Sequence, residues 1–139
     1  MIDKFAIAKA LNDEARNVIT PLPDIELISE GEQFTPKANK AYIKESVLFN
    51  TDNAIGLGDN SSDISFSIYQ LMVITPRSNK GAKWQALALV RDLQTQLYRG
   101  LTLQHNGQKL RIKTTSVSPL LPDKTHFTYA LSINFSAIG

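Results

Sequence analysis

The sequence predicts a single α+β domain over residues 1–139, in which a mostly antiparallel or mixed β-sheet has two α-helices packed on one face. Two stretches, 3–16 and 82–98, repeat apolar residues at helical spacing. Two others, 64–75 and 127–136, show the patterns typical of strands, namely alternation of apolar and polar residues or a continuous apolar run. The order of elements is helix, strands, helix, strands, which favours helices gathered on one side of a sheet. A chain of 139 residues can bury a sizeable core.

The first predicted helix begins at Asp3, whose side chain can cap it, and continues to about Arg16. Pro21 and Pro23 end it and begin an extended connection. A short strand is predicted at 25–28, before a polar loop.

Residues 41–49 form the next predicted strand, because Ile43, Val47 and Phe49 alternate with polar positions. Glu45 interrupts the apolar face of this strand. A buried carboxylate needs a partner, so we expect this strand to lie at an edge of the sheet or against an interface.

A long polar connection follows at 50–63 and contains two isolated apolar residues, Ile55 and Leu57. Loops of this length in compact domains are typically functional or mobile. Two interpretations stay open, namely a flexible hairpin tip and a binding loop that orders on contact with a partner.

The strongest predicted strand is 64–75. It alternates at Phe66 and Ile68 and then becomes apolar on both faces through 71–74, which predicts a central strand covered on both sides over its second half. Pro76 ends this strand and leads to the second helix.

The second predicted helix, 82–98, contains neither glycine nor proline and is the element around which the rest is organised. Its apolar stripe consists of Ala82, Ala86, Leu89, Val90, Leu93 and Leu97. Ser78 or Asn79 can cap its first turn, and Gly100 can take the left-handed conformation that closes a helix. Because an isolated helix of this length is marginal in water, we expect the stripe to dock on the sheet.

A hairpin is predicted at Asn106-Gly107, a dipeptide that favours a type I′ turn. The resulting register places His105 opposite Gln108, Leu103 opposite Leu110, and Leu101 opposite Ile112. The last predicted strand, 127–136, alternates strictly and is expected to be half-buried and antiparallel.

The side of the second helix opposite its stripe is predicted to be a candidate interface. Trp84, Leu87, Arg91 and Tyr98 lie there at helical spacing, where a solvated face would usually carry Lys, Glu and Gln. Two interpretations stay open. Either another element of the same chain covers these residues, or they contact a partner.

A small basic cluster, Arg77, Lys80 and Lys83, marks the start of this helix. Lysines there oppose the helix dipole, so helix stability does not explain them. They are interpreted either as solvated charge or as a contact for an acidic partner or a phosphate.

Composition excludes several classes of function. The chain has no cysteine, so it has no disulfide, thiolate metal site or cysteine nucleophile. A net charge of +2 does not by itself indicate a nucleic-acid or membrane surface. No apolar run is long enough to span a membrane, and no signal peptide is recognised. His105 and His126 lack companions at ligand spacing, so neither a metal site nor a cofactor is predicted.

One ordered series of motifs resembles a known family. The motifs are Phe34-Thr35-Pro36, Ala41-Tyr42-Ile43, Ile55-Gly56-Leu57-Gly58, the strand 68–76, Gly81-Ala82-Lys83, Tyr98-Arg99-Gly100 and Ser132-Ile133-Asn134-Phe135. In this order, over residues 34–136, they resemble the tail terminator proteins of long-tailed bacteriophages, including the lambdoid type. The chain departs from that pattern at Ser65 and Ser67, where family members often carry glycine, and in the turn 119–124.

The resemblance implies a non-enzymatic virion protein that assembles in the host cytoplasm. It implies a hexameric ring that caps the tail tube, ends tail elongation and offers a surface for head joining. The implied partners are further copies of the chain, the tail tube protein and the head–tail connector, with the chain monomeric before assembly as an alternative. DNA passes through such rings, but the near-neutral charge argues against tight sequence-independent DNA binding.

Two other functions stay open from the sequence. One is a neck or head-closure adaptor of the phage head–tail junction. The other is a small ligand-binding domain or enzyme, for which Glu45 is the one carboxylate expected to be buried.

Overall fold

The computed structural model describes residues 2–22, 24–35, 39–49, 53–54, 63–64, 66–121 and 124–138. Within them the elements follow in the order α1 (Lys4–Ile19), β1 (Glu26–Ile28), β2 (Tyr42–Leu48), β3 (Asn53–Ala54), β4 (Asp63–Ile64), β5 (Phe66–Pro76), α2 (Ala82–Gln96), β6 (Thr102–His105), β7 (Gln108–Val117) and β8 (His126–Ile138).

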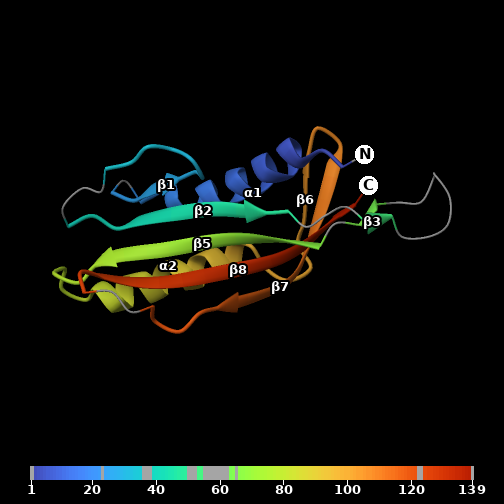
Figure 1. Cartoon of the computed structure of the whole chain (residues 1–139). Helices are drawn as coiled ribbons and strands as arrows, with labels where there is room; N and C mark the ends of the chain where they lie inside the picture. The colour runs from blue at the N-terminus through green and yellow to red at the C-terminus, as the bar shows by residue number, and fades with distance from the viewer. Residues whose placement is uncertain are drawn as a thin grey trace.

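Six strands form one sheet in the order β1-β2-β5-β8-β7-β6, and β3 pairs with β4 separately. β1 and β2 are parallel, whereas the other neighbours are antiparallel, so the sheet is mixed. Both helices lie behind the sheet in the view of Figure 1, on the same face. This arrangement confirms the predicted α+β class.

Helix α1 begins as predicted, because the side chain of Asp3 accepts a hydrogen bond from the backbone N–H of Ala6 at 3.1 Å. It continues past Arg16 to Ile19, since nothing in the sequence breaks a helix before Pro21. Its core face consists of Ala6, Ile7, Ala10, Leu11, Ala15 and Ile19.

Helix α2 buries the whole predicted stripe. Its capping was predicted wrongly. The N-cap is Gly81, at φ +73°, and it makes no side-chain capping bond. The side chains of Ser78 and Asn79 instead contact Asn39, at 3.0 Å and 2.9 Å, and so tie the start of the helix to the loop before β2.

The C-terminal end of α2 also differs from the prediction, because the helix ends at Gln96 and its C-cap is Leu97. Gly100 does adopt a positive φ, +90°. However, its N–H donates to the carbonyl of Ile112 at 2.8 Å, so it turns the chain into β6 and does not close the helix.

The main core lies between the two helices and the sheet. Its largest fully buried side chains are Ile7, Leu11, Ile43, Tyr69, Leu71, Leu93, Leu97, Leu110, Ile112, Leu131, Ile133 and Phe135. A smaller cluster on the other face of the sheet consists of Ile28, Tyr42 and Ile74, with Phe34 and Met72 packed against it. β5 is therefore a central strand with apolar contacts on both faces over its second half, as predicted.

The β6–β7 hairpin has the predicted register, with Leu103 opposite Leu110. Asn106 and Gly107 both have positive φ, 49° and 84°, as a type I′ turn requires. β8 is more buried than the half-buried strand expected from its alternation, because it lies between β5 and β7 and residues such as Thr128 on the side away from the helices are also buried.

Candidate functional site

The outward side of α2 places two large aromatic side chains in solvent. Trp84 is 73% exposed and Tyr98, just past the end of the helix, is 53% exposed. Within the described residues no element of the chain covers either one. Leu87 differs from this, because it is only partly exposed and packs against the edge of the main core.

Arg91 lies between these two aromatic residues and extends into solvent, with 73% of its side chain exposed. Its Nε atom is 3.3 Å from a carboxylate oxygen of Asp92, the next residue. A pair this exposed adds little to stability, so Arg91 remains accessible to another molecule.

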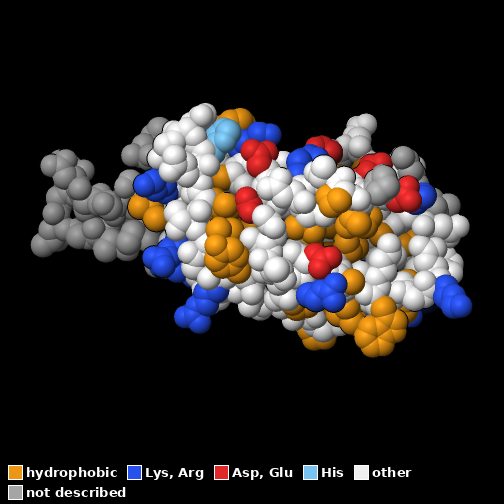
Figure 2. All heavy atoms as spheres, turned by 180° about the vertical axis from the view of Figure 1, so that it is seen from behind, with side chains coloured by type: hydrophobic (Ala, Val, Ile, Leu, Met, Phe, Trp, Pro, Cys, Tyr) orange, Lys and Arg blue, Asp and Glu red, His pale blue; other side chains and the backbone are white. Residues whose placement is uncertain are grey.

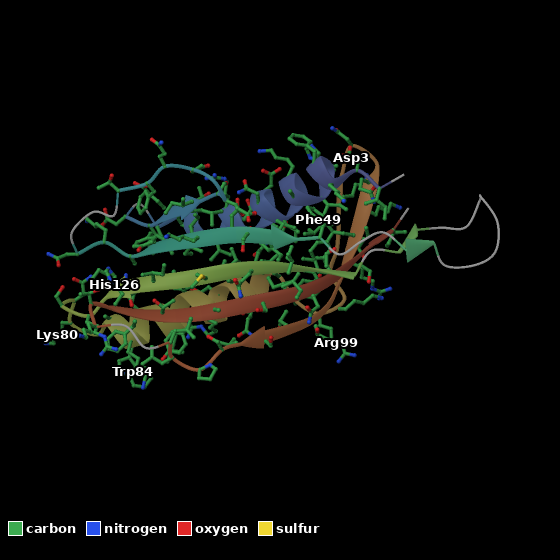
Figure 3. The ribbon with its side chains drawn as sticks, viewed as in Figure 1. Asp3, Phe49, Lys80, Trp84, Arg99 and His126 are labelled. Carbon is green, nitrogen blue, oxygen red and sulfur yellow. The ribbon has the colours of Figure 1, made fainter. Side chains whose placement is uncertain are left out.

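The basic cluster lies at the N-terminal end of α2, the end of the helix that carries Trp84. The guanidinium of Arg77 lies 4.5 Å from the ring centroid of Phe127, and its Nε donates to the carbonyl of His126 at 3.4 Å. Lys83 places its Nζ 6.0 Å from the centroid of Trp84. Figure 3 shows Lys80 and Trp84 at the same end of the molecule. Arg77, Lys80, Lys83 and Trp84 are referred to below as the Trp84 patch.

The predicted surface is not one continuous patch. Tyr98 lies fourteen positions after Trp84, which corresponds to about 20 Å along a helix axis. Figure 3 shows Arg99, the neighbour of Tyr98, at the opposite end of the molecule from Lys80. The structure therefore places Trp84 and Lys80 at one end of the molecule, with Lys83 beside the Trp84 ring, and leaves Tyr98 apart. Ile55 and Leu57 lie outside the described residues.

Glu45 is buried, and its strand does not lie at an edge of the sheet, so the first of the two predicted locations was wrong, whereas the second, against an interface, stays a prediction. The short parallel strand β1 occupies the edge, and β2 lies between β1 and β5. The carboxylate has the partners that its burial requires. Asn12 and Ser29 donate to Oε1 at 2.5 Å and 2.7 Å, and the hydroxyl of Tyr69 donates to Oε2.

This network changes the acidity of Tyr69. Burial of the phenol raises its pKa well above the usual value, and the negative charge of Glu45 raises it further. A protonated Tyr69 therefore remains a hydrogen-bond donor to Glu45 across the neutral range. Three donors on one carboxylate hold it in place, which is a structural role.

Two hollows adjoin Glu45. The first, about 450 Å³, lies between α1 and β2 and is lined by Phe5, Ala8, Lys9, Asn12, Arg16, Ser29, Glu30, Glu45, Ser46, Val47 and Phe49. The second, about 430 Å³, is lined by Ile28, Ser29, Glu30, Gly31, Glu32, Phe34, Lys44, Glu45, Ser46 and Met72. The second is referred to below as the Glu32 hollow.

The described part of the chain contains no group of three or more His, Asp or Glu side chains that could hold a metal ion. No helix in that part is long and apolar enough to cross a membrane.

Sequence reasoning missed four further exposed apolar side chains, of which Phe5 on α1 and Leu48 at the end of β2 are the most exposed, followed by Ile138 and Val117. Phe5 and Leu48 are out of phase with the buried pattern of their own element, since Ile7 and Leu11 are buried in α1 and Val47 packs on the core in β2. That break in phase was the signal that could have identified them.

A family model described as phage tail terminator protein matches residues 6–135 of this chain. The chain belongs to the phage tail terminator family. A tail terminator family member is a structural protein of the phage particle, which agrees with the exposed apolar surface.

Solved structures show that the fold of this tail terminator family protein occurs elsewhere. A chain from the virion of a native gene transfer agent particle has a TM-score of 0.63 and 13% identity, with 96% of each chain covered. Another solved chain, which carries no functional name, has a TM-score of 0.77 and 17% identity, with 99% of this chain and 96% of that chain covered. At these identities the likeness concerns the fold alone. No curated protein matches the sequence.

Proposed function

We propose that this tail terminator family protein closes into a hexameric ring on the end of the tail tube. The ring ends tail elongation and offers the surface to which the head–tail connector binds. The observation that carries the proposal is Trp84, which is 73% exposed on a regular helix, beside lysines that form no ion pair within the described residues. Tryptophan is the residue type most enriched at the energetic centres of interfaces, and an exposed indole is a large apolar surface to leave in water.

The separation of the candidate surfaces suits an assembly with several partners. A subunit of a ring needs two different complementary patches for its neighbours, and further surfaces for the layers above and below. The Trp84 patch serves one of these contacts in the proposal. Tyr98 and the 50–63 loop, with Ile55 and Leu57, serve the tail tube or the connector.

The proposal requires no bond to be made or broken, and no cofactor. Glu45, the carboxylate that could have supported an enzyme, is held by Asn12, Ser29 and Tyr69 within the fold. In the proposal the protein remains in the host cytoplasm until it joins the virion.

The test is light scattering and negative-stain imaging of the protein alone and mixed with purified tail tubes. We expect rings with sixfold symmetry at one end of each tube, and tubes that stop growing when the protein is added. A protein that stays monomeric in both conditions would contradict the proposal. Binding to a portal-side protein in preference to the tube would instead indicate a neck or head-closure adaptor.

The loop provides a second test. Leu57→Ser should lower the yield of joined particles and leave the melting temperature unchanged, because the change removes an apolar contact for a partner. A matched Ser61→Ala change in the same loop should leave joining intact. If Leu57→Ser joins as well as the parent protein, the loop is not a contact surface.

A further inference from the structure

We propose that the Trp84 patch of one copy of this chain inserts into the Glu32 hollow of the next copy. This inference rests on the proposed ring and names the two surfaces that meet in it. An apolar side chain that fits a hollow elsewhere on the same protein makes a head-to-tail contact, and such contacts form closed rings when the rotation between subunits allows it.

The first argument is shape. Trp84 stands out from α2 as a single bulky side chain at 73% exposure. The Glu32 hollow, about 430 Å³, has apolar side chains from three different segments in its wall, namely Ile28, Phe34 and Met72. An indole ring placed there would remove apolar surface of both copies from water.

The second argument is charge. The Trp84 patch carries three cations, Arg77, Lys80 and Lys83, and within the described residues none of them forms an ion pair. The Glu32 hollow is lined by three carboxylates and one lysine. In the described part of the chain Glu30 and Glu32 are likewise without a salt bridge, so the two surfaces have opposite unpaired charges.

Charge also decides between the two hollows. The hollow between α1 and β2 is lined by Lys9 and Arg16 as well as two carboxylates, so it would place cations against Lys80 and Lys83. The Glu32 hollow has an excess of negative charge instead.

The third argument is placement. Figures 1 and 3 share one view, in which β1 lies in the upper part of the molecule, Trp84 lies on the lower margin and Lys80 lies at the left end. Figure 2 shows apolar side chains standing out along the lower margin of the helix side, with basic side chains beside them. When copies stand side by side in the same orientation, a surface on one margin of each copy meets the surface on the opposite margin of the next copy.

The absence of cysteine from the sequence permits a direct test by disulfide trapping. Lys83→Cys and Glu32→Cys are made in separate copies, mixed in equal amounts under assembly conditions, and oxidised. A disulfide needs Cα atoms within about 7 Å, so it forms efficiently only between residues in contact. We expect the mixed dimer at a yield at least about 10-fold above that of two control mixtures, Lys83→Cys with Lys9→Cys and Lys83→Cys with Arg99→Cys.

Charge reversal provides the second test. Lys80→Glu with Lys83→Glu in one protein, and Glu30→Lys with Glu32→Lys in another, should each weaken self-association by at least about 10-fold. Mixing the two proteins should restore assembly, because each altered surface then meets a complementary one. These side chains are exposed, and circular dichroism should show that both proteins remain folded.

Several results would overturn the inference. Efficient trapping of Lys83→Cys with itself would indicate a symmetric contact. If Lys9→Cys is trapped as efficiently as Glu32→Cys, the choice of the Glu32 hollow over the hollow between α1 and β2 is wrong. Preferential trapping of Glu32→Cys by tail tube protein would give the hollow a different occupant. If assemblies form without the expected trapping, only this inference is wrong. If no assembly forms even with tail tubes, the proposed ring is wrong as well.

Discussion

The hydroxyl of Tyr69 donates a hydrogen bond to Oε2 of Glu45 in the interior between α1 and the sheet. The other carboxylate oxygen accepts from Asn12 and Ser29, so one side chain connects α1, β5 and the segment after β1. The network therefore holds the short edge strand β1 and helix α1 against the centre of the sheet.

Removing the carboxylate should destabilise the fold. Glu45→Leu leaves buried donors without an acceptor, and each such donor costs about 1–3 kcal/mol. Urea denaturation should show this loss in the free energy of unfolding. Lys44→Leu, the exposed neighbour on the other side of β2, is the control and should change it by less than about 0.5 kcal/mol. Equal effects of the two changes would contradict the structural role of Glu45.

The same contact predicts a dependence of stability on pH. The pKa of Tyr69 is raised in the folded state, so above the ordinary tyrosine value the unfolded chain releases this proton more readily than the folded one. The stability that this raised pKa contributes is fully present below about pH 10. It is lost as the pH rises from there through the pKa of Tyr69 in the folded state, at about 1.4 kcal/mol per pH unit. Urea denaturation at a series of pH values from 8 to 11 should show that the free energy of unfolding falls more steeply with pH for the parent protein than for Tyr69→Phe. Parallel curves would contradict this assignment.

Two residues of α2 should behave in opposite ways. Leu93 is fully buried, so Leu93→Ala should cost about 2–5 kcal/mol of stability. Trp84→Ala should change stability by less than about 1 kcal/mol, because the side chain is 73% exposed, yet it should weaken self-association. Thermal melts and light scattering on the same samples separate the two effects. Unfolding of Trp84→Ala would show that Trp84 belongs to the core.

The elements that sequence reasoning placed correctly are those with strong local signals. The stripe of α2, the Asp3 cap and the Asn106-Gly107 hairpin each depend on residues within a few positions of one another. The errors depend on distant contacts. Ser78 and Asn79 were expected to cap α2, but Asn39, about forty residues earlier, provides their partners.

The position of Glu45 shows the same limit. Its burial and its need for a partner follow from the alternation of β2, whereas its three donors come from α1, the residue after β1, and β5. The candidate surface was predicted residue by residue from helical spacing, but the helix ends at Gln96, so Tyr98 does not continue the line of Trp84. Hollows formed between segments, such as the Glu32 hollow, have no periodic signal in a sequence.

The hairpin turn allows a test of backbone strain alone. Gly107 has φ +84°, and a Cβ placed there would meet nothing within 4 Å. Gly107→Ala should therefore lower stability by about 1–2 kcal/mol through the left-handed backbone conformation and not through a clash. Asn106→Gly, at the other positive φ, is the matched control and should be tolerated. A neutral Gly107→Ala would indicate that the turn can change type.

Gln108 connects the two ends of the described chain, and its removal should loosen both. Its Oε1 accepts from the N–H of Asp3 at 3.0 Å, and its Nε2 donates to the carbonyl of Ile138 at 2.8 Å. Gln108→Leu fills similar space but leaves both backbone groups unpaired, at a cost of about 1–3 kcal/mol. Because Asp3 also caps α1, amide hydrogen exchange should become faster in the first turn of that helix and near Ile138, while the centre of the sheet stays protected.

The control for this change is Lys109→Leu, at the exposed neighbouring position of the same strand. Lys109 lies opposite Ile138 in the β7–β8 pair, but among the described residues its side chain forms no hydrogen bond or ion pair, so exchange at both ends should stay at the parent rate. If Gln108→Leu and Lys109→Leu give the same exchange pattern, the ends are held by strand pairing alone. Faster exchange confined to Gln108→Leu would mean that a single amide side chain positions the start of α1 against the end of β8, and with it the side of the molecule that carries Phe5.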